Sequence, residues 1–244
     1  MPPGEFRWVL GLDEAGRGSL LGPLVVGGFA VPASEGIDAE LRGLGTKDSK
    51  ALSARRREEV FEGLCRRGTL LAAWADPPEV DRWVRGPGLN ALEVALMGGL
   101  IRRCSPGLVL ADACDVDADR FARHLRRQLP PSFPRVRIVA RHKADRDLPL
   151  VSAASIVAKV TRDHRMVQLA HTLGEEMGTG YPSDPRTRRH LEDLLARHRD
   201  LPPHVRRTWA TVGRVSRSMH PGEPLERWGG SGPSPAGAPE DEGL

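Results

Sequence analysis

The segment from Val9 to Gly18 constrains the fold more than any other stretch, because an apolar run leads directly into acids and glycines there. The apolar residues of Phe6 to Leu12 cluster as in a buried β-strand. Asp13 and Glu14 follow at the end of that strand, and Gly16-Arg17-Gly18 then predicts a tight turn. Neighbouring residues of a regular strand point to opposite faces, so both acids can face one site only if the chain distorts here. Two carboxylates at one site would attract a hard divalent cation.

The same order, an apolar strand followed by an acid, recurs twice further along the chain. A strand over Leu108 to Leu110 precedes Asp112, and a strand over Arg135 to Ala140 leads to Asp145. Open α/β sheets place their sites at the carboxyl ends of such strands. Spacing alone leaves the choice of acids open, because further acids follow both positions: Asp115, Asp117, Asp119 and Asp147. For the first three of these we expect a helix start and a solvated face.

Strands early in the chain, followed by alternating strands and helices, predict an α/β domain with a mixed central sheet. Ser19 to Val31 is the expected hairpin partner of the first strand. The remaining expected elements are a strand over Thr69 to Ala75 and helices over Ala54 to Arg67, Asn90 to Cys104, Asp117 to Leu129, Val151 to Leu173, Asp184 or Thr187 to His198, and Val205 to Arg217. From His220 onward Gly, Pro, Ser and acids dominate, which predicts one domain over residues 1–219 and a disordered tail over 220–244.

Several long motifs stand in the order found in type 2 ribonuclease H, also called ribonuclease HII, and most of the chain resembles that family. The motifs are GLDEAGRGSLLGPLVVGGFAVP from Gly11, TKDSK from Thr46, ADA from Ala111, HKAD from His142, VSAASIVAKVTRD from Val151 and GTGYPSDPRT from Gly178. The forms KDSK, HKAD and GYPSDP are closer to the archaeal and eukaryotic branch than to the usual bacterial one. Motifs of this length in a fixed order are specific.

The resemblance implies a ribonuclease H-like sheet flanked by helices, with an added helical region at the carboxyl end. It implies an endoribonuclease that cuts the RNA strand of RNA/DNA hybrids and incises 5′ of a single ribonucleotide in duplex DNA, as in primer removal and ribonucleotide excision repair. By the same resemblance, Asp13, Glu14, Asp112 and Asp145 are the catalytic acids and hold two metal ions, Mg²⁺ or Mn²⁺. Products would carry 3′-hydroxyl and 5′-phosphate ends.

The resemblance also assigns residues to the substrate. In the turn formed by Gly16, Arg17 and Gly18, the two glycines let the backbone approach a ribose 2′-hydroxyl, the group that distinguishes RNA from DNA. Tyr181, the only tyrosine of the chain, would pack against the neighbouring sugar, although a loop tyrosine can also serve packing alone. All four lysines lie inside the motifs, and candidates for phosphate contacts are Lys47, Ser49, Lys50 and Lys143. Ser155 and Lys159 share a helix face and either contact phosphate or satisfy internal polar groups.

A net charge of +4 permits a polyanionic partner without demanding one. The sequence has no apolar run of membrane-spanning length and no signal peptide, so we expect a cytoplasmic protein without a membrane partner. We expect a monomer. The tail from His220 lacks the paired aromatics of a clamp-binding motif and gives no support to a sliding-clamp partner. Clusters of arginine are interpreted as solvated helix faces: Arg55 to Arg57, Arg186 to Arg189, and Arg206 to Arg207.

Two other functions fit part of the pattern. A related metal-dependent nuclease acting on DNA would need no sensor of the 2′-hydroxyl and would cut all-DNA duplexes equally well. A hybrid-binding protein without turnover would bind nucleic acid and never hydrolyse it, which the four intact acids disfavour.

Overall fold

The computed structural model describes residues 7–46, 52–197 and 200–220. The chain divides into two compact units. Unit 1 comprises residues 1–15, 25–74 and 93–161, and unit 2 comprises residues 16–24, 75–92 and 162–244. The single catalytic domain over residues 1–219 stays a prediction. The predicted disorder from residue 220 falls, except for His220, outside the described residues.

A five-stranded mixed sheet with the order β3-β2-β1-β4-β5 forms the centre of unit 1. Its strands are β1 (Trp8–Ala15), β2 (Leu24–Pro32), β3 (Thr69–Ala75), β4 (Leu108–Asp112) and β5 (Arg137–Arg141). β1 pairs antiparallel with β2 and parallel with β4, and β4 pairs parallel with β5. The predicted α/β fold, its mixed sheet and its first hairpin are therefore confirmed.

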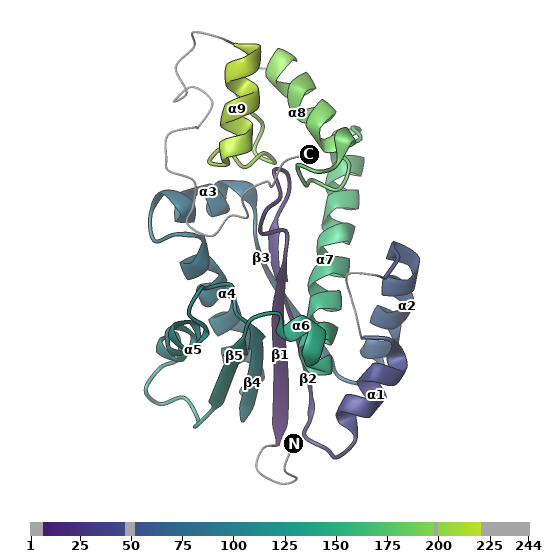
Figure 1. Ribbon diagram of the computed structural model, residues 1–244, viewed down its shortest axis with the longest axis vertical. Coiled ribbons are helices and arrows are strands. Elements are labelled where there is room, and N and C mark those ends of the chain that lie inside the picture. Colours follow the sequence, from purple (N-terminus) through teal and green to yellow (C-terminus); the bar gives the residue numbers. More distant parts are fainter. Residues whose placement is uncertain (1–6, 47–51, 198–199, 221–244) are drawn as a thin grey trace. The chain divides into compact units, whose positions relative to one another are not determined.

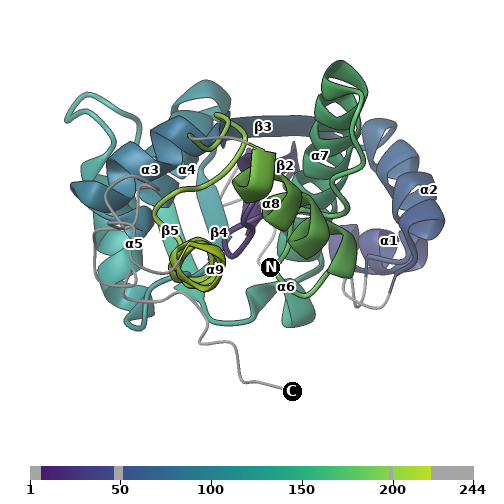
Figure 2. The same ribbon diagram turned by 90° about the horizontal axis from the view of Figure 1, so that it is seen from above.

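Helices cover both faces of this sheet (Figures 1 and 2). On one face, Leu10 and Leu12 of β1 pack with apolar residues of α4 and α5, and on the other Val9 packs with apolar residues of α1, α2 and α7. This alternation follows from the two-residue period of a strand. The helices of this part of the chain are α1 (Ile37–Leu44), α2 (Ala54–Cys65), α4 (Leu89–Cys104), α5 (Ala118–Arg127), α6 (Ala144–Asp147) and α7 (Pro149–Leu173).

Unit 2 is mainly helical and contains the last part of α7. Its other helices are α3 (Pro77–Arg85), α8 (Pro185–Arg197) and α9 (Ala210–Met219). They include the helical region predicted at the carboxyl end. A single β-bridge joins Leu21 to Val205, so the segment before β2 and the segment before α9 lie side by side.

The observed elements differ from the predicted ones where backbone groups have found other partners. β2 begins at Leu24 rather than Ser19, because the amides of Leu20 and Leu21 donate to the carbonyl oxygen of Gly180 instead of a strand. The last helix begins at Ala210 rather than Val205. Three helices were not predicted: α1, α3 and α6. Of these, α3 carries a readable signal, since proline occupies its first turn.

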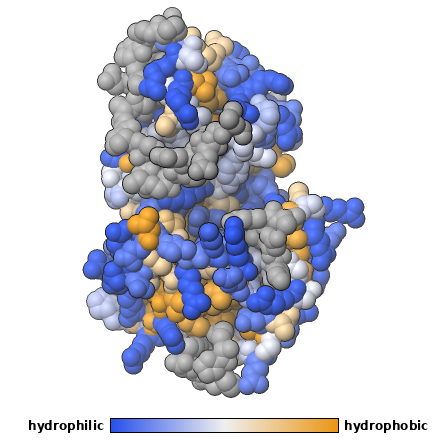
Figure 3. All heavy atoms as spheres, in the orientation of Figure 1, coloured by the Kyte–Doolittle hydropathy of each residue, from blue (hydrophilic) through white to orange (hydrophobic). Residues whose placement is uncertain are grey.

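No helix in the described ranges is long and apolar enough to cross a bilayer. Figure 3 shows hydrophilic side chains over most of the visible face, with smaller apolar patches between them. None of Cys65, Cys104 and Cys114 forms a disulfide.

Candidate active site

Asp13 lies in β1 where α7 approaches the sheet closely. Its register partner in β2 is Gly27, and a Cβ on Gly27 would lie 2.4 Å from the carbonyl oxygen of Ala154 in α7. Only glycine leaves room for the helix at this distance. The Ser155 hydroxyl of α7 consequently donates a hydrogen bond to the Asp13 carboxylate. Of the two roles left open for Ser155, this bond supports the satisfaction of an internal polar group.

A sharp turn after β5 brings Asp145 to Asp112. Asp112 is the last residue of β4, and its Oδ1 accepts a hydrogen bond of 2.8 Å from the backbone N–H of Ala144. The preceding residue, Lys143, has a φ of 56°, a left-handed conformation that residues other than glycine rarely adopt. This turn starts α6 directly beside the end of β4, with Asp145 in its first turn.

Three carboxylates therefore interact at the carboxyl ends of the strands. The side chains of Asp13 and Asp145 are only 5% and 3% exposed. Burial is the main cause that raises the pKa of Asp13 to about 7, and the carboxylates of Asp112 and Asp145 raise it as well. Hydrogen bonds from Ser155 and from the Glu14 amide act in the opposite direction. Like charges crowded in a dry site would be relieved by a cation.

Glu14 lies in β1 without the distortion that the sequence suggested. The strand continues to Ala15 and pairs Glu14 with Val26, so Asp13 and Glu14 leave the backbone toward opposite faces. The distortion begins only at Gly16, with a φ of 86°. The assignment of Glu14 to the same site as Asp13 stays a prediction.

The donor set fits a hard divalent ion in its chemistry. As the side chains lie, no three His, Cys, Asp or Glu residues in the described part of the chain form a ready ligand set. However, the interacting groups are all carboxylates, which are the ligands that Mg²⁺ and Mn²⁺ prefer. Burial and the repulsion from Asp112 and Asp145 raise the pKa of Asp13, and a bound cation would remove the repulsion. The acids that interact here, Asp13, Asp112 and Asp145, would contribute to holding the ion.

The neighbouring acids have other partners. Asp117 is the N-cap of α5 and accepts from the Arg120 amide at 2.9 Å, which confirms the expected helix start. Asp115 is only 6% exposed and bonds to the Arg120 guanidinium, so its expected place on a solvated face is wrong. Asp147 is exposed. Electrostatic contact with Asp13 thus distinguishes Asp112 and Asp145 from the acids that trail them.

The glycine turn and Tyr181, both in unit 2, are bonded directly to each other. The backbone N–H of Gly16 donates to the Tyr181 hydroxyl at 2.9 Å. A Cβ on Gly16 would lie 2.4 Å from Nε of Arg162, so the turn requires glycine for space as well as for its positive φ. The Arg17 guanidinium donates to the side-chain oxygen of Asn90 at 2.6 Å. Two features assigned to substrate recognition therefore share one hydrogen-bonded structure.

A buried arginine that the sequence analysis missed supports both features. Arg162 is 2% exposed and donates to the carbonyl oxygens of Leu21, Pro23 and Thr179 at 3.1, 3.3 and 3.0 Å. Its guanidinium carbon also lies 4.6 Å from the centre of the Tyr181 ring, within cation–π range. Burial lowers the pKa of Arg162. One side chain thus links the chain after the glycine turn to the loop that carries Tyr181.

A second buried arginine holds the turn from another direction. Arg206 is fully buried and donates to the carbonyl oxygen of Arg17 at 3.1 Å and twice to that of Gly22, also at 3.1 Å. Its guanidinium carbon lies 4.9 Å from the centre of the Trp209 ring. The interpretation of Arg206 as part of a solvated helix face is therefore wrong. It precedes α9, and its charge is used inside unit 2.

The loop before α8 is fixed by side chains of the same motif. Asp184 accepts from the backbone N–H groups of Thr179 and Arg186 at 2.8 and 2.9 Å. The bond from Thr179 is the main cause that lowers the pKa of Asp184 to about 2. Thr187 is buried and accepts from the Gly180 amide at 2.9 Å. Tyr181 is thus held by a loop whose backbone polar groups are satisfied on both sides.

Most of the remaining substrate candidates lie outside the described residues. Lys47, Ser49 and Lys50 fall outside the described residues. Lys143 is described and exposed, and its backbone forms the turn before α6. Its contact with phosphate stays a prediction.

The fold class is shown by structural comparison. Bst-RNase HIII, solved in complex with Mn²⁺, matches with a TM-score of 0.71 at 19% identity, over 88% of this chain and 71% of that one. At this identity the match establishes the fold alone. The molecule therefore has the ribonuclease H-like α/β fold, with acids at the carboxyl ends of its central strands.

More similar proteins establish the family. The ribonuclease HII of Methanocella arvoryzae is 41% identical over 85% of this chain and 91% of its own length. The ribonuclease H2 of Pyrococcus horikoshii matches with a TM-score of 0.77 at 38% identity, over 88% of this chain and 99% of that one. The RNase HII solved with PCNA from Archaeoglobus fulgidus matches with a TM-score of 0.74 at 38% identity, over 82% of this chain and 94% of that one. The family profile of ribonuclease HII matches residues 10–212.

The chain belongs to the ribonuclease HII family. It is therefore a ribonuclease H enzyme that acts on RNA/DNA hybrids, in a family that depends on divalent metal. The resemblance read from the motifs is confirmed, and so is its archaeal character.

Proposed function

We propose that Asp13, Glu14, Asp112 and Asp145 hold two divalent ions, Mg²⁺ or Mn²⁺, during hydrolysis of the RNA strand. Bound ions would supply an activated water and stabilise the leaving oxygen of the scissile phosphodiester. Support comes from the burial of Asp13 and from its repulsion by Asp112 and Asp145, which together disfavour its charged form without cations. Cleavage on this pattern leaves a 3′-hydroxyl and a 5′-phosphate.

We further propose that the enzyme incises 5′ of a single ribonucleotide in duplex DNA. The observation that carries this proposal is the hydrogen bond of 2.9 Å between the Gly16 amide and the Tyr181 hydroxyl. The phenol oxygen accepts from Gly16, and the phenol O–H can still donate to a ribose 2′-hydroxyl. The backbone of Gly16, Arg17 and Gly18 would read the same hydroxyl, while the Tyr181 ring packs on the adjoining sugar.

Four further residues are proposed to hold the duplex by its phosphates. They are Lys47, Ser49, Lys50 and Lys143. Contacts of this kind fix the position of the duplex without reading its sequence. They would serve long hybrids and single ribonucleotides equally.

An incision assay on three matched duplexes tests both proposals. The substrates are all-DNA, RNA/DNA hybrid, and DNA with one ribonucleotide, each with EDTA, Mg²⁺ or Mn²⁺. We expect metal-dependent cutting of the second and third substrates only, with a 3′-hydroxyl on the upstream product. Equal cutting of all-DNA duplex would favour the related DNA nuclease. Binding of hybrid without hydrolysis in either metal would favour the non-catalytic alternative.

Assembly and location complete the proposal. We propose a cytoplasmic monomer with one catalytic domain over residues 1–219, whose tail sequence gives no support to a sliding-clamp partner. The Archaeoglobus fulgidus relative was solved with PCNA, so a clamp deserves a direct test. Light scattering of the purified chain, alone and with a clamp from an archaeon, should give the monomer mass in both cases. A co-migrating complex would overturn the statement on the clamp.

A further inference from the structure

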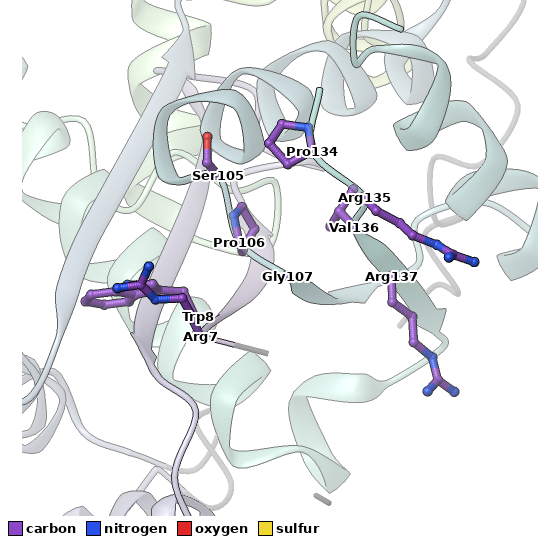
Figure 4. A pocket seen from close by; sticks show the side chains of 9 residues that line it. All are labelled: Arg7, Trp8, Ser105, Pro106, Gly107, Pro134, Arg135, Val136 and Arg137. Carbon is purple, nitrogen blue, oxygen red and sulfur yellow. The ribbon is translucent and has the colours of Figure 1, made fainter. Parts of the chain in front are cut away.

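A hollow lies at the opposite end of the unit 1 sheet from the acids. Its volume is about 1020 Å³, and it surrounds the starts of β1, β4 and β5 (Figure 4). Trp8 begins β1, five residues before Asp13, which corresponds to about 16 Å along a strand. The contact that holds a nucleic-acid strand at the acids therefore does not extend to this hollow.

The backbone fixes the spacing across the hollow. The Gly107 N–H donates to the carbonyl oxygen of Trp8 at 3.0 Å, and the Arg137 N–H donates to that of Gly107 at 2.9 Å. Trp8 and Arg137 thus stand two strand spacings apart, or about 10 Å. Gly107 between them has no side chain. Figure 4 shows Arg7 and Trp8 on one side of Gly107, and Arg135 and Arg137 on the other.

The hollow is strongly basic. Among the described residues that line it, three are arginines, Arg7, Arg135 and Arg137, and none is acidic. The surrounding segment 121–144 has six arginines and one lysine but no Asp or Glu, in a chain whose net charge is only +4. Arginines in the last turns of α4 and α5 can be explained by the helix dipole. The lining arginines lie outside helices, so the dipole does not account for them.

An exposed aromatic ring accompanies these charges. Trp8 is 39% exposed. Exposure alone is not informative, because Trp74 in β3 is 42% exposed as well. The difference is that Trp8 lines a hollow together with guanidinium groups, the combination that binds stacked bases and phosphates.

We propose that this hollow is a second nucleic-acid site that takes single-stranded DNA or RNA. An unpaired base stacks on Trp8, and the forked guanidiniums of Arg135 and Arg137 bind phosphates on the other side of Gly107. The separation of about 10 Å corresponds to roughly three base steps of a strand. A duplex fits less well, because its bases are already stacked and paired. The site binds a single-stranded extension without cutting it.

Binding of a labelled single strand of about 12 nucleotides, followed by fluorescence anisotropy in EDTA, tests the proposal. The full chain is saturated with unlabelled blunt RNA/DNA hybrid, so the duplex-binding face is occupied and the second site is measured. We expect Trp8→Ala to weaken binding about tenfold, within the range for loss of one stacked base. Trp74→Ala, the matched control, should change it less than about twofold.

A charge reversal tests the phosphate contacts. Arg135→Glu with Arg137→Glu should weaken binding and lower the salt slope by about 1.4, for two single-strand phosphate contacts. Arg55→Glu with Arg66→Glu makes the same charge change on α2 and its C-cap, and should leave the slope unchanged. Hydrolysis of blunt hybrid and the circular dichroism melt should stay as in the wild type for all variants.

Three results would overturn the proposal. Saturating blunt hybrid could remove all single-strand binding, which would place both ligands at the acids. Trp8→Ala could weaken single-strand binding no more than Trp74→Ala does. Polyglutamate could compete as well as the oligonucleotide, which would identify a surface for acidic proteins instead.

Discussion

Replacement of Tyr181 by Phe removes a single oxygen and separates the hydroxyl of this residue from its ring. The hydroxyl accepts from the buried Gly16 amide, and the ring lies 4.6 Å from the Arg162 guanidinium. Phe keeps the ring and loses the hydrogen bond. The amide of Gly16 then loses its partner in the turn proposed to read the 2′-hydroxyl.

The expected size of the effect follows from this one bond. A neutral hydrogen bond contributes about 0.5 to 1.5 kcal/mol net, so loss of order in the turn should slow incision at a single ribonucleotide by roughly two- to tenfold. Destabilisation by about 1 kcal/mol would lower the melting temperature by about 2 to 4 °C. Tyr181→Ala removes the ring too and should slow the same reaction by at least roughly tenfold, since stacking adds about 1 to 3 kcal/mol.

The assay compares kcat/KM on DNA with one ribonucleotide and on a long hybrid, with Tyr181→Phe and Tyr181→Ala measured side by side. A long hybrid offers many registers and many 2′-hydroxyls, so both variants should impair it less. Equal losses on both substrates, or no loss on either, would return Tyr181 to a packing role. A large loss for Ala with none for Phe would assign recognition to the ring and refute the role of the hydroxyl.

Three further predictions concern the acids, the helix contact and a buried histidine pair. Asp13→Asn should abolish metal-dependent cleavage and keep the fold, and wild-type turnover at saturating metal would contradict this. Gly27→Ala should lower the free energy of unfolding in denaturant by about 1 to 3 kcal/mol, because its Cβ meets a carbonyl oxygen of α7, whereas Gly43→Ala meets no atom within 4 Å and should not. Burial lowers the pKa of His190, whose Nε2 lies 3.2 Å from that of His204. Neutral His190 therefore contributes fully to the free energy of unfolding above the unfolded pKa of about 6.5, and this contribution is lost as the pH falls below that value. His190→Gln should make the free energy of unfolding less dependent on pH between about pH 7.5 and 5.5.

The strands and their acids were predictable because one simple rule governs them. An apolar run of strand length must be buried, and an acid at its carboxyl end then reaches the sheet edge where sites form. This rule placed Asp13 and Asp112, and β3 was predicted with its observed bounds. It did not locate the distortion near Glu14, because a glycine turn permits a distortion without determining where the distortion starts. In the structure, pairing with β2 continues to Ala15.

The close contact of α7 with the sheet was beyond a sequence pattern for a different reason. Gly27 reads as a weak point in a strand, and nothing in the periodicity shows that a helix backbone occupies the space its side chain would need. The bond from Ser155 to Asp13 depends on that approach. Contacts that depend on an absent side chain have no local signal.

The buried arginines show the same limit most clearly. In a chain that uses arginine nearly everywhere, Arg162 and Arg206 cannot be told from solvated neighbours by composition or spacing. Inside unit 2 the Arg162 guanidinium bonds to carbonyl oxygens of two separate segments, and the Arg206 guanidinium bonds to those of Arg17 and Gly22 in one turn. A lysine ammonium with its compact charge would not do this in the same fork geometry. Backbone carbonyls left bare in a loop are costly when buried, so an irregular turn such as Gly16 to Pro23 needs donors from outside itself. The glycines make the turn possible, and the arginines hold it in one conformation.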